Sequence, residues 1–222
     1  MIRKAIIFDM DGVIINSEPL YELADIDFLS RRGITYNRES IANILLGKSL
    51  WDTTQILKDI HSITESTQQL MEERLNLIEE LYQSSLTYIT GFLEIHQYLV
   101  EREIKTCIAT ASHNHLLDVA NKKLGLANIF GQDIFKISDV GDKSKPDPAI
   151  FLYAADKLKT PPEECCVIED SPNGIMAAKN AGMYCIGITT SRTSEDLNLA
   201  DFVVSSHNEI IQLFKQSESE TV

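Results

Sequence analysis

Cationic and aromatic side chains are scarce in this sequence. Its 222 residues include 20 lysines and arginines against 33 aspartates and glutamates, a formal net charge of −13, and 7% are aromatic. The acidic excess argues against nucleic acid or an anionic membrane surface as the main partner. No run approaches the ~20 consecutive apolar residues that a membrane-spanning helix needs. Any phosphate site must therefore rest on a metal, a lysine and backbone amides rather than on a basic face.

Cysteine is also rare. Each of the four cysteines lies in an apolar run typical of a buried strand: Cys107, Cys165, Cys166 and Cys185. Such cysteines behave as small reduced hydrophobic residues rather than as a disulfide framework. The residues at 1–4 lead into an apolar run that is too short for a signal peptide. We therefore expect the cytoplasm as the compartment.

The most informative stretch is an apolar run, residues 5–8, that ends in Asp9, Asp11 and Gly12. A short apolar run bounded by a glycine turn indicates a buried strand. Two carboxylates one residue apart repel each other unless a cation lies between them or one holds a proton. Mg2+ suits such a site because it takes hard oxygen ligands and often pairs with phosphate. A carboxylate can also act as a nucleophile and form an aspartyl-phosphate.

Strands and helices alternate over most of the remaining chain. Strand-like runs recur at 87–89, 105–109, 135–137, 165–168, 184–188 and 202–204. Helical periodicity separates these runs, which predicts βαβ units and an α/β fold with a doubly wound parallel sheet. In such sheets ligands bind at the carboxyl ends of the strands.

Between the first strand and the run at 87–89 the sequence shows only helical patterns. We therefore predict an α/β catalytic core made of residues 1–16 and 87–215, with a small helical cap inserted at 17–86. Residues 216–222 are rich in serine and glutamate, which predicts a disordered tail.

Polar residues follow the predicted strand at 105–109. Thr110, Ala111 and Ser112 come directly after it, and Asn114 lies at the start of the next helix. A hydroxyl and free backbone amides at a helix start form an anion site. The alternative is that Ser112 is an ordinary helix N-cap.

Two further strand-to-helix loops carry charge. Lys145 lies in the loop before a helix that begins near Pro148, where it could neutralise a phosphate and a nucleophile at once. Glu169 and Asp170 follow the strand at 165–168 and could complete a metal site, or Asp170 could cap the next helix.

Each of these features has an ordinary explanation when it is taken alone. Asp9 and Asp11 could be part of a solvated turn, and a loop lysine is usually solvated. Together, however, an acid pair, a hydroxyl, a lysine and a second acid pair follow strands of one sheet. This combination predicts a phosphate-and-metal site at the carboxyl edge of that sheet.

The sequence resembles the haloacid dehalogenase superfamily, whose members are mostly Mg2+-dependent phosphatases. The match extends over the whole chain and follows the order of the family's motifs. The four motifs correspond to Asp9-Met10-Asp11-Gly12-Val13, to Thr110, to Lys145 within Ser144–Pro148, and to Glu169-Asp170-Ser171. The helical insert resembles the family's small cap. Sugar-phosphate phosphatases and β-phosphoglucomutases are the most similar subgroup.

The resemblance implies a role for each acidic motif residue. Asp9 attacks phosphorus and becomes an aspartyl-phosphate. Asp11 protonates the leaving oxygen and then takes a proton from the hydrolytic water. Mg2+ is held by Asp9, by the backbone carbonyl of Asp11 and by Asp170, with Glu169 nearby.

The remaining motif residues are implied to bind phosphate. Thr110 and the backbone amides that follow it hold the phosphoryl oxygens, in the stretch that contains Ala111, Ser112 and Asn114. Lys145 pairs with Asp9 and with the phosphate. The implied reaction is hydrolysis of a small phosphorylated metabolite, and a cap of this size, closing over a small site, favours a sugar phosphate. Because the capped site is complete in one chain, we expect a monomer.

Within the predicted cap, Gly47 and Lys48 are candidates for substrate contact, because a glycine lets backbone approach closely and the lysine reaches a charged or hydroxyl group. Glu18 resembles an acidic residue near the substrate entrance of the phosphatases; it could equally be a first-turn helix acid. A phosphosugar mutase is the alternative function. The corresponding mutases carry a histidine and an arginine where this sequence has Tyr21 and Leu50, and these departures favour the hydrolase.

Two other classes of protein remain as alternatives. A phosphoryl-accepting signalling domain needs its acceptor aspartate on a middle strand and has no such helical insert. A catalytically idle phosphate-binding or scaffold protein of this fold is expected to have lost Asp9 or Asp11, and both are present.

Overall fold

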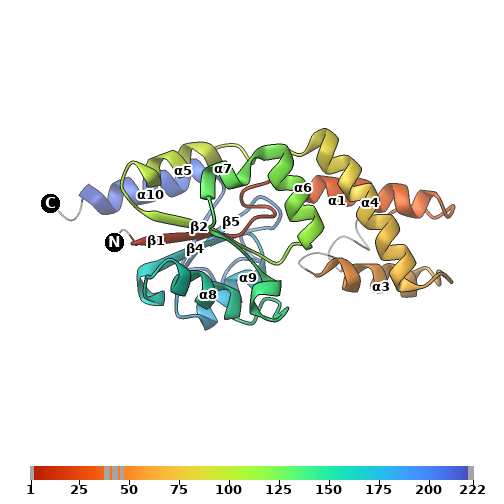
Figure 1. The fold of residues 1–222 in the computed structure, drawn as a ribbon. Helices are drawn as coiled ribbons and strands as arrows, with labels where there is room; N and C mark the ends of the chain where they lie inside the picture. The colour runs from red at the N-terminus through yellow and green to blue at the C-terminus, as the bar shows by residue number, and fades with distance from the viewer. Residues whose placement is uncertain (1–2, 38–40, 42–44, 46–47, 220–222) are drawn as a thin grey trace. The chain divides into compact units, whose positions relative to one another are not determined.

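The computed structural model describes residues 3–37, 41, 45 and 48–219. The chain folds as two compact units (Figure 1). The first unit, the catalytic unit, comprises residues 1–16, 88–111 and 126–222. The second unit, the helical unit, comprises residues 17–87 and 112–125.

The catalytic unit is built on a six-stranded sheet with the order β3-β2-β1-β4-β5-β6. The strands are β1 (Ala5–Phe8), β2 (Lys105–Thr110), β3 (Ile134–Lys136), β4 (Cys165–Glu169), β5 (Tyr184–Ile188) and β6 (Phe202–Val204). Every pairing is parallel. In the register, Ile7 of β1 lies between Cys107 of β2 and Val167 of β4. The predicted α/β fold with a parallel sheet is confirmed.

Helices cover both faces of this sheet, as its apolar strands require. They are α5 (Phe92–Val100), α7 (Leu126–Phe130), α8 (Ala149–Lys157), α9 (Pro172–Asn180) and α10 (His207–Ser219), with the 3-10 turns η1 (Ile137–Val140) and η2 (Pro162–Glu164). Figure 1 shows α5 and α10 on one face and α8 and α9 on the other. Under α8 and α9 the core contains Ile7, Val167, Phe151 and Ile175, all fully buried.

The helical unit contains α1 (Glu18–Ser30), α3 (Leu50–Ile60), α4 (Thr67–Ser85) and α6 (Asn114–Leu124). The longest of these helices, α4, begins with a capping box in which Ser66 and Gln69 satisfy each other's backbone amides. It packs against α1, α3 and α6. Its Arg74 is buried in the middle of the unit and forms an ion pair with Asp25 of α1 at 2.6 Å.

The four cysteines are buried and free, as predicted. No helix among the described residues is both long and apolar enough to span a membrane.

The structure differs from the sequence-based expectations at three places. Residues 87–89 form no strand, because Tyr88 makes only an isolated bridge to Ile15. Segment 112–125, expected in the core, belongs to the helical unit because α6 packs on α4. Helix α10 extends through Ser219 into the expected tail, since Ile210 and Phe214 bury one side of it; residues 220–222 lie outside the described residues.

Candidate active site

The candidate active site forms where β1 and β4 leave the sheet side by side. Their register pairs Phe8 with Ile168, so the acidic residues that follow each strand emerge at the same edge. The amide of Asp9 donates to the carbonyl of Ile168 at 3.0 Å, which continues the ladder by one residue. Asp9, Glu169 and Asp170 are all buried. The sheet therefore brings together two acid pairs that are far apart in the sequence.

Lys145 joins these two strand ends. Its ammonium donates to Asp9 Oδ1 at 2.5 Å, to Glu169 Oε1 at 2.8 Å and to the carbonyl of Ala109 at 3.3 Å. The side chain is 7% exposed. The loop that carries it is fixed locally, because Asp147 Oδ1 accepts from the amide of Ala149, the first residue of α8. The predicted lysine thus lies among the predicted acids.

The charges of this cluster shift its pKa values in opposite directions. Burial raises the pKa of Asp9 to about 7; Lys145 opposes that rise, and Glu169 and Asp11 add to it. Burial of Lys145 disfavours its charged form, but the carboxylates of Asp9 and Glu169 outweigh this and raise its pKa above the usual range. The lysine therefore stays charged. The raised pKa of Asp9 means that its ionised form depends on positive charge nearby.

Glu169 is fully engaged inside the protein. Its Oε2 accepts from the amides of Asp170 and Ser171 and from Ser171 Oγ, each at 2.9 Å, while its Oε1 accepts from Lys145. A Cβ on Gly174 would lie 1.7 Å from Oε1, so α9 approaches this carboxylate closely only because residue 174 is a glycine. These contacts occupy both carboxylate oxygens of Glu169 within the protein. Its role as a metal ligand stays a prediction.

Asp170 lies against the loop that follows β1. Gly12 has a φ of +74°, and a Cβ there would lie 2.0 Å from Asp170 Oδ2. The loop is compact, since the amides of Ile14 and Ile15 both donate to the carbonyl of Met10. This is the close approach that the glycine in Asp9-Met10-Asp11-Gly12 permits.

One loop of the site was missed from the sequence. After β5, Ser191 Oγ donates to Asp170 Oδ2 and Thr190 Oγ1 donates to the carbonyl of Gly12. This loop therefore orients both Asp170 and the turn that carries Asp11. The signal was available, because the run at 184–188 was predicted as a strand and its hydroxyl residues follow at the same edge.

The other predicted residues fall into three groups. Thr110 is buried at the end of β2, and Ala111 follows it in the catalytic unit. Ser112, Asn114, Glu18 and Lys48 belong to the helical unit, and their contact with substrate stays a prediction. Gly47 lies outside the described residues.

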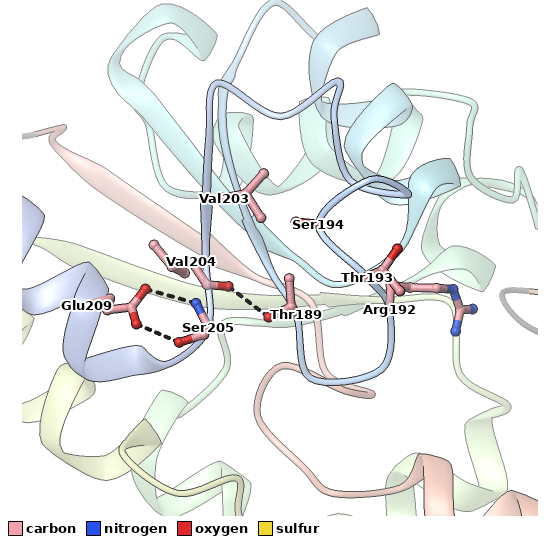
Figure 2. Close-up of a pocket in the computed structure, with 8 residues that line it drawn as sticks. All are labelled: Thr189, Arg192, Thr193, Ser194, Val203, Val204, Ser205 and Glu209. Carbon is pink, nitrogen blue, oxygen red and sulfur yellow. Dashed lines mark hydrogen bonds between the residues drawn. The ribbon is translucent and has the colours of Figure 1, made fainter.

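A pocket opens at the ends of β5 and β6 (Figure 2). It is lined by Thr189, Arg192, Thr193, Ser194, Val203, Val204, Ser205 and Glu209. Its polar groups bond to one another: Glu209 accepts from the amide and hydroxyl of Ser205 at 2.9 and 2.5 Å, and the amide of Thr189 donates to the carbonyl of Val204 at 2.9 Å. None of the residues singled out from the sequence lines this pocket, and we assign it no part in the chemistry.

Asp9, Asp11, Lys145, Glu169 and Asp170 form the acid–lysine cluster. Its oxygen donors suit a hard divalent cation. Of the four acidic residues Asp9, Asp11, Glu169 and Asp170, two, Asp9 and Glu169, pair with Lys145, and the pKa of Asp9 is raised in part by its acidic neighbours. Among the described residues no three acidic, histidine or cysteine side chains are arranged to hold a metal by themselves. Mg2+ does not need such a cage, because it commonly binds one or two carboxylates together with water and a substrate phosphate. The residues present therefore fit Mg2+ bound together with phosphate.

Comparison with known proteins identifies the family of this chain. A model of the haloacid dehalogenase-like hydrolases matches residues 3–182. The chain therefore belongs to the haloacid dehalogenase-like hydrolase family, as the sequence motifs predicted. The family match covers β1 through α9 and hence every residue of the acid–lysine cluster.

Individual relatives align over nearly the whole chain. Hexitol phosphatase B of Escherichia coli K12 is 30% identical over 214 residues, which are 93% of each protein. A family hydrolase of Deinococcus radiodurans, solved with bound phosphate and sodium, has 26% identity, covers 97% of this chain and 96% of that chain, and has a TM-score of 0.81. A putative beta-phosphoglucomutase from Thermotoga maritima has 27% identity, covers 96% and 99%, and has a TM-score of 0.78. The prediction of an enzyme, a phosphoric monoester hydrolase, is confirmed.

Proposed function

We propose that this protein hydrolyses the phosphate ester of a small sugar or sugar alcohol through an aspartyl-phosphate on Asp9, with Mg2+ as cofactor. The observation that carries the proposal is the ion pair of a buried Asp9 with Lys145 at the carboxyl edge of the sheet. Its aligned relatives include hexitol phosphatase B and a phosphorylated carbohydrates phosphatase of Thermotoga maritima. Polyol and sugar phosphates are therefore the first substrates to test.

In the proposed first step Asp9 attacks phosphorus in line with the leaving oxygen. The bond from phosphorus to the ester oxygen breaks as the bond to an Asp9 oxygen forms. Lys145 binds Asp9 Oδ1, so the other oxygen, Oδ2, is the proposed nucleophile. The lysine also balances negative charge that spreads over the phosphoryl oxygens in the transition state.

Asp11 is the proposed acid and base. It lies two residues beyond the nucleophile in the compact turn held by Met10. In the first step its carboxyl proton goes to the leaving alcohol oxygen. In the second step the carboxylate takes a proton from the water that attacks the aspartyl-phosphate, and Asp9 is released with inorganic phosphate. Thr110 and the amide of Ala111 are the proposed donors to the phosphoryl oxygens.

Mg2+ would be held by the side chains of Asp9 and Asp170 and by the backbone carbonyl of Asp11. It supplies positive charge that stabilises the phosphoryl oxygens. Glu169 is proposed to act through Lys145, since its own oxygens are occupied by the lysine and by the loop at 170–171. Ser191 orients Asp170 through its hydroxyl. We further propose that the enzyme acts as a monomer in the cytoplasm.

A phosphosugar mutase is the second candidate, because a solved structure named as a putative beta-phosphoglucomutase shares the fold over 96% of this chain. The two residues that weaken this assignment lie in the helical unit. Tyr21 packs edge-on against Tyr82 with the ring centroids 6.2 Å apart. Leu50 is the first residue of α3. Neither side chain offers a charged group for a second phosphate.

The test is phosphate release from a panel of hexitol, hexose, pentose and glycerol phosphates with Mg2+. In parallel, β-glucose 1-phosphate with a trace of the 1,6-bisphosphate is assayed for glucose 6-phosphate. Free phosphate without isomerisation supports the phosphatase and begins to identify the substrate. Glucose 6-phosphate with little free phosphate would establish the mutase instead, and no turnover of any ester would contradict both.

A further inference from the structure

The chain leaves the catalytic unit after Asn16 and returns to it at Tyr88. On the catalytic side these two crossing segments are bonded to each other. Ile15 and Tyr88 form an antiparallel bridge, and the amide of Ile89 donates to the carbonyl of Ile14 at 2.9 Å. Ile14 and Ile15 are fully buried. These two of the chain's four crossings between the units therefore form one paired structure within the catalytic unit; the other two lie at 111–112 and 125–126.

A buried histidine lies against the second crossing. His207, the first residue of α10, is fully buried, and its Nδ1 lies 3.3 Å from the carbonyl of Thr90. Gly91 has a φ of +87°, and a Cβ added there would lie 3.1 Å from the Cβ of His207. The imidazole also meets the ring of Phe92, with centroids 6.1 Å apart at an angle of 70°. His207 thus contacts three consecutive residues, 90–92.

The surroundings keep this imidazole neutral. Burial lowers the pKa of His207, and the carbonyls of Thr90 and Val13 and the carboxylate of Glu94 in α5 only partly oppose this. Its place at the N-terminus of α10 disfavours positive charge as well. With Thr90 as acceptor, the geometry assigns the proton to Nδ1. The other nitrogen, Nε2, has no hydrogen-bond partner among the described residues.

We propose that His207 is a positioning residue that anchors the crossing at 88–91 to the catalytic unit and thereby sets how readily the chain bends there during turnover. Nδ1 holds the Thr90 carbonyl, and the side chain fills the space that Gly91 leaves open. No substrate contact is implied. The expected effect on activity rests on the proposed function, because bending of the chain at this crossing affects turnover only if the helical unit moves during the reaction.

The first test is hydrogen exchange of the full-length protein without substrate. His207→Leu keeps an apolar group of similar size but removes the donor. We expect exchange at the Ile89 amide to rise roughly 2- to 12-fold, the effect of one lost hydrogen bond, with no rise in β1. His207→Asn restores a donor and should return the rate towards wild type. Gln212→Ala, an exposed change on α10, is the matched control.

Unchanged exchange at Ile89 in a folded His207→Leu would overturn the proposal. An equal rise in β1 and at Ile89 would also overturn it, because it would mean general destabilisation. If His207→Leu does not fold, Gly91→Ala tests the same contact from the other side and should raise Ile89 exchange in the same selective way. Among folded variants, kcat and KM should change together for His207→Leu and recover in His207→Asn. Absence of phosphatase activity would count against the proposed function. The exchange rate at Ile89 would then decide by itself whether His207 anchors the crossing.

Discussion

Each unit of this protein buries one cation among polar partners, but the two clusters are built differently. In the helical unit, Arg74 donates to Asp25 through Nε and Nη2 at 2.9 and 2.6 Å and to Thr53 and Thr54 through Nη1 at 2.8 and 2.7 Å. One positive charge meets one negative charge, and Nη1 donates to the two hydroxyls and to the carbonyl of Leu50. In the catalytic unit, Lys145 meets two carboxylates, and two more acids follow within the same turns.

The difference separates a cluster that holds a fold together from one that we propose does chemistry. The Arg74 cluster joins α1, α3 and α4, and in it Arg74 is paired with one carboxylate, Asp25, whose pKa is raised by burial against the opposing effect of Arg74. The Lys145 cluster keeps an excess of negative charge at a strand end. Burial first, and then the acidic neighbours Glu169 and Asp11, raise the pKa of Asp9 to about 7 against the opposing effect of Lys145. Such an excess is stable only with a further cation or a proton, and that is the property a metal-dependent phosphoryl-transfer site needs.

The largest effect should come from Asp9, the proposed nucleophile of the acid–lysine cluster. Asp9→Asn keeps the shape but removes the attacking carboxylate, so kcat is expected to fall at least about 10⁴-fold. Lys145 keeps Glu169 as a partner, and the melting temperature should change little. Phosphate release and a thermal scan check this, with the exposed Asp118→Asn as control. Hydrolysis near the wild-type rate by a well-purified variant would remove Asp9 as the nucleophile.

Substitution in the Arg74 cluster of the helical unit should change stability instead of activity. Arg74→Met leaves Asp25 buried without a partner, which is expected to lower the free energy of unfolding by about 3–5 kcal/mol. Urea unfolding measures this loss, and the double variant with Asp25→Leu should recover part of it. A loss below about 1 kcal/mol would mean that the buried pair is not what joins the three helices.

Lys145→Met tests whether the two clusters truly differ. We expect kcat to fall about 10²–10³-fold, since one fixed positive group is lost from the transition state. Stability should fall less than in Arg74→Met, because Asp9 already takes up a proton near pH 7. The two variants are compared by kcat and by urea midpoint. The reverse pattern, with stability lost and activity kept, would make Lys145 a structural residue like Arg74.

The smallest effect concerns pH and the metal. A proton on Asp9 competes with a bound cation, and the pKa of about 7 places that competition below neutrality. Mg2+ should therefore bind up to about tenfold more weakly at pH 6 than at pH 8, as calorimetry can measure. Asp9→Asn should abolish this difference, whereas Asp11→Asn should keep it because its side chain is not a proposed ligand. Equal affinity at both pH values in the wild type would contradict Asp9 as a ligand.

The catalytic cluster could be predicted from sequence, and the helical cluster could not. The positions of the catalytic cluster's residues follow from local patterns, because Asp9 and Glu169 follow apolar runs and Lys145 precedes a helix. A parallel sheet brings such positions to one edge, so side-chain packing need not be known to predict the cluster. Ser191 obeys the same rule and was missed only because the rule was not applied after the strand at 184–188.

Arg74 and His207 are a different case. An arginine in a polar-rich helix is expected on the surface, and its burial depends on Asp25 and Thr53, which lie on two other helices. Likewise, a histidine near the C-terminus gives no sign that it meets residues 90–92. Both positions are set by packing between elements distant in the chain, which periodicity within one element does not report.

The strand order has a consequence for how the protein is made. Strand β1 is synthesised first, but its neighbours in the sheet are β2 and β4, which begin at Lys105 and Cys165. At translation rates of about 5–20 residues per second, β1 waits roughly 8–30 s for its second partner. Throughout that interval Asp9 has no Lys145 or Glu169 beside it. The proposed nucleophile is therefore made well before the last groups of its site.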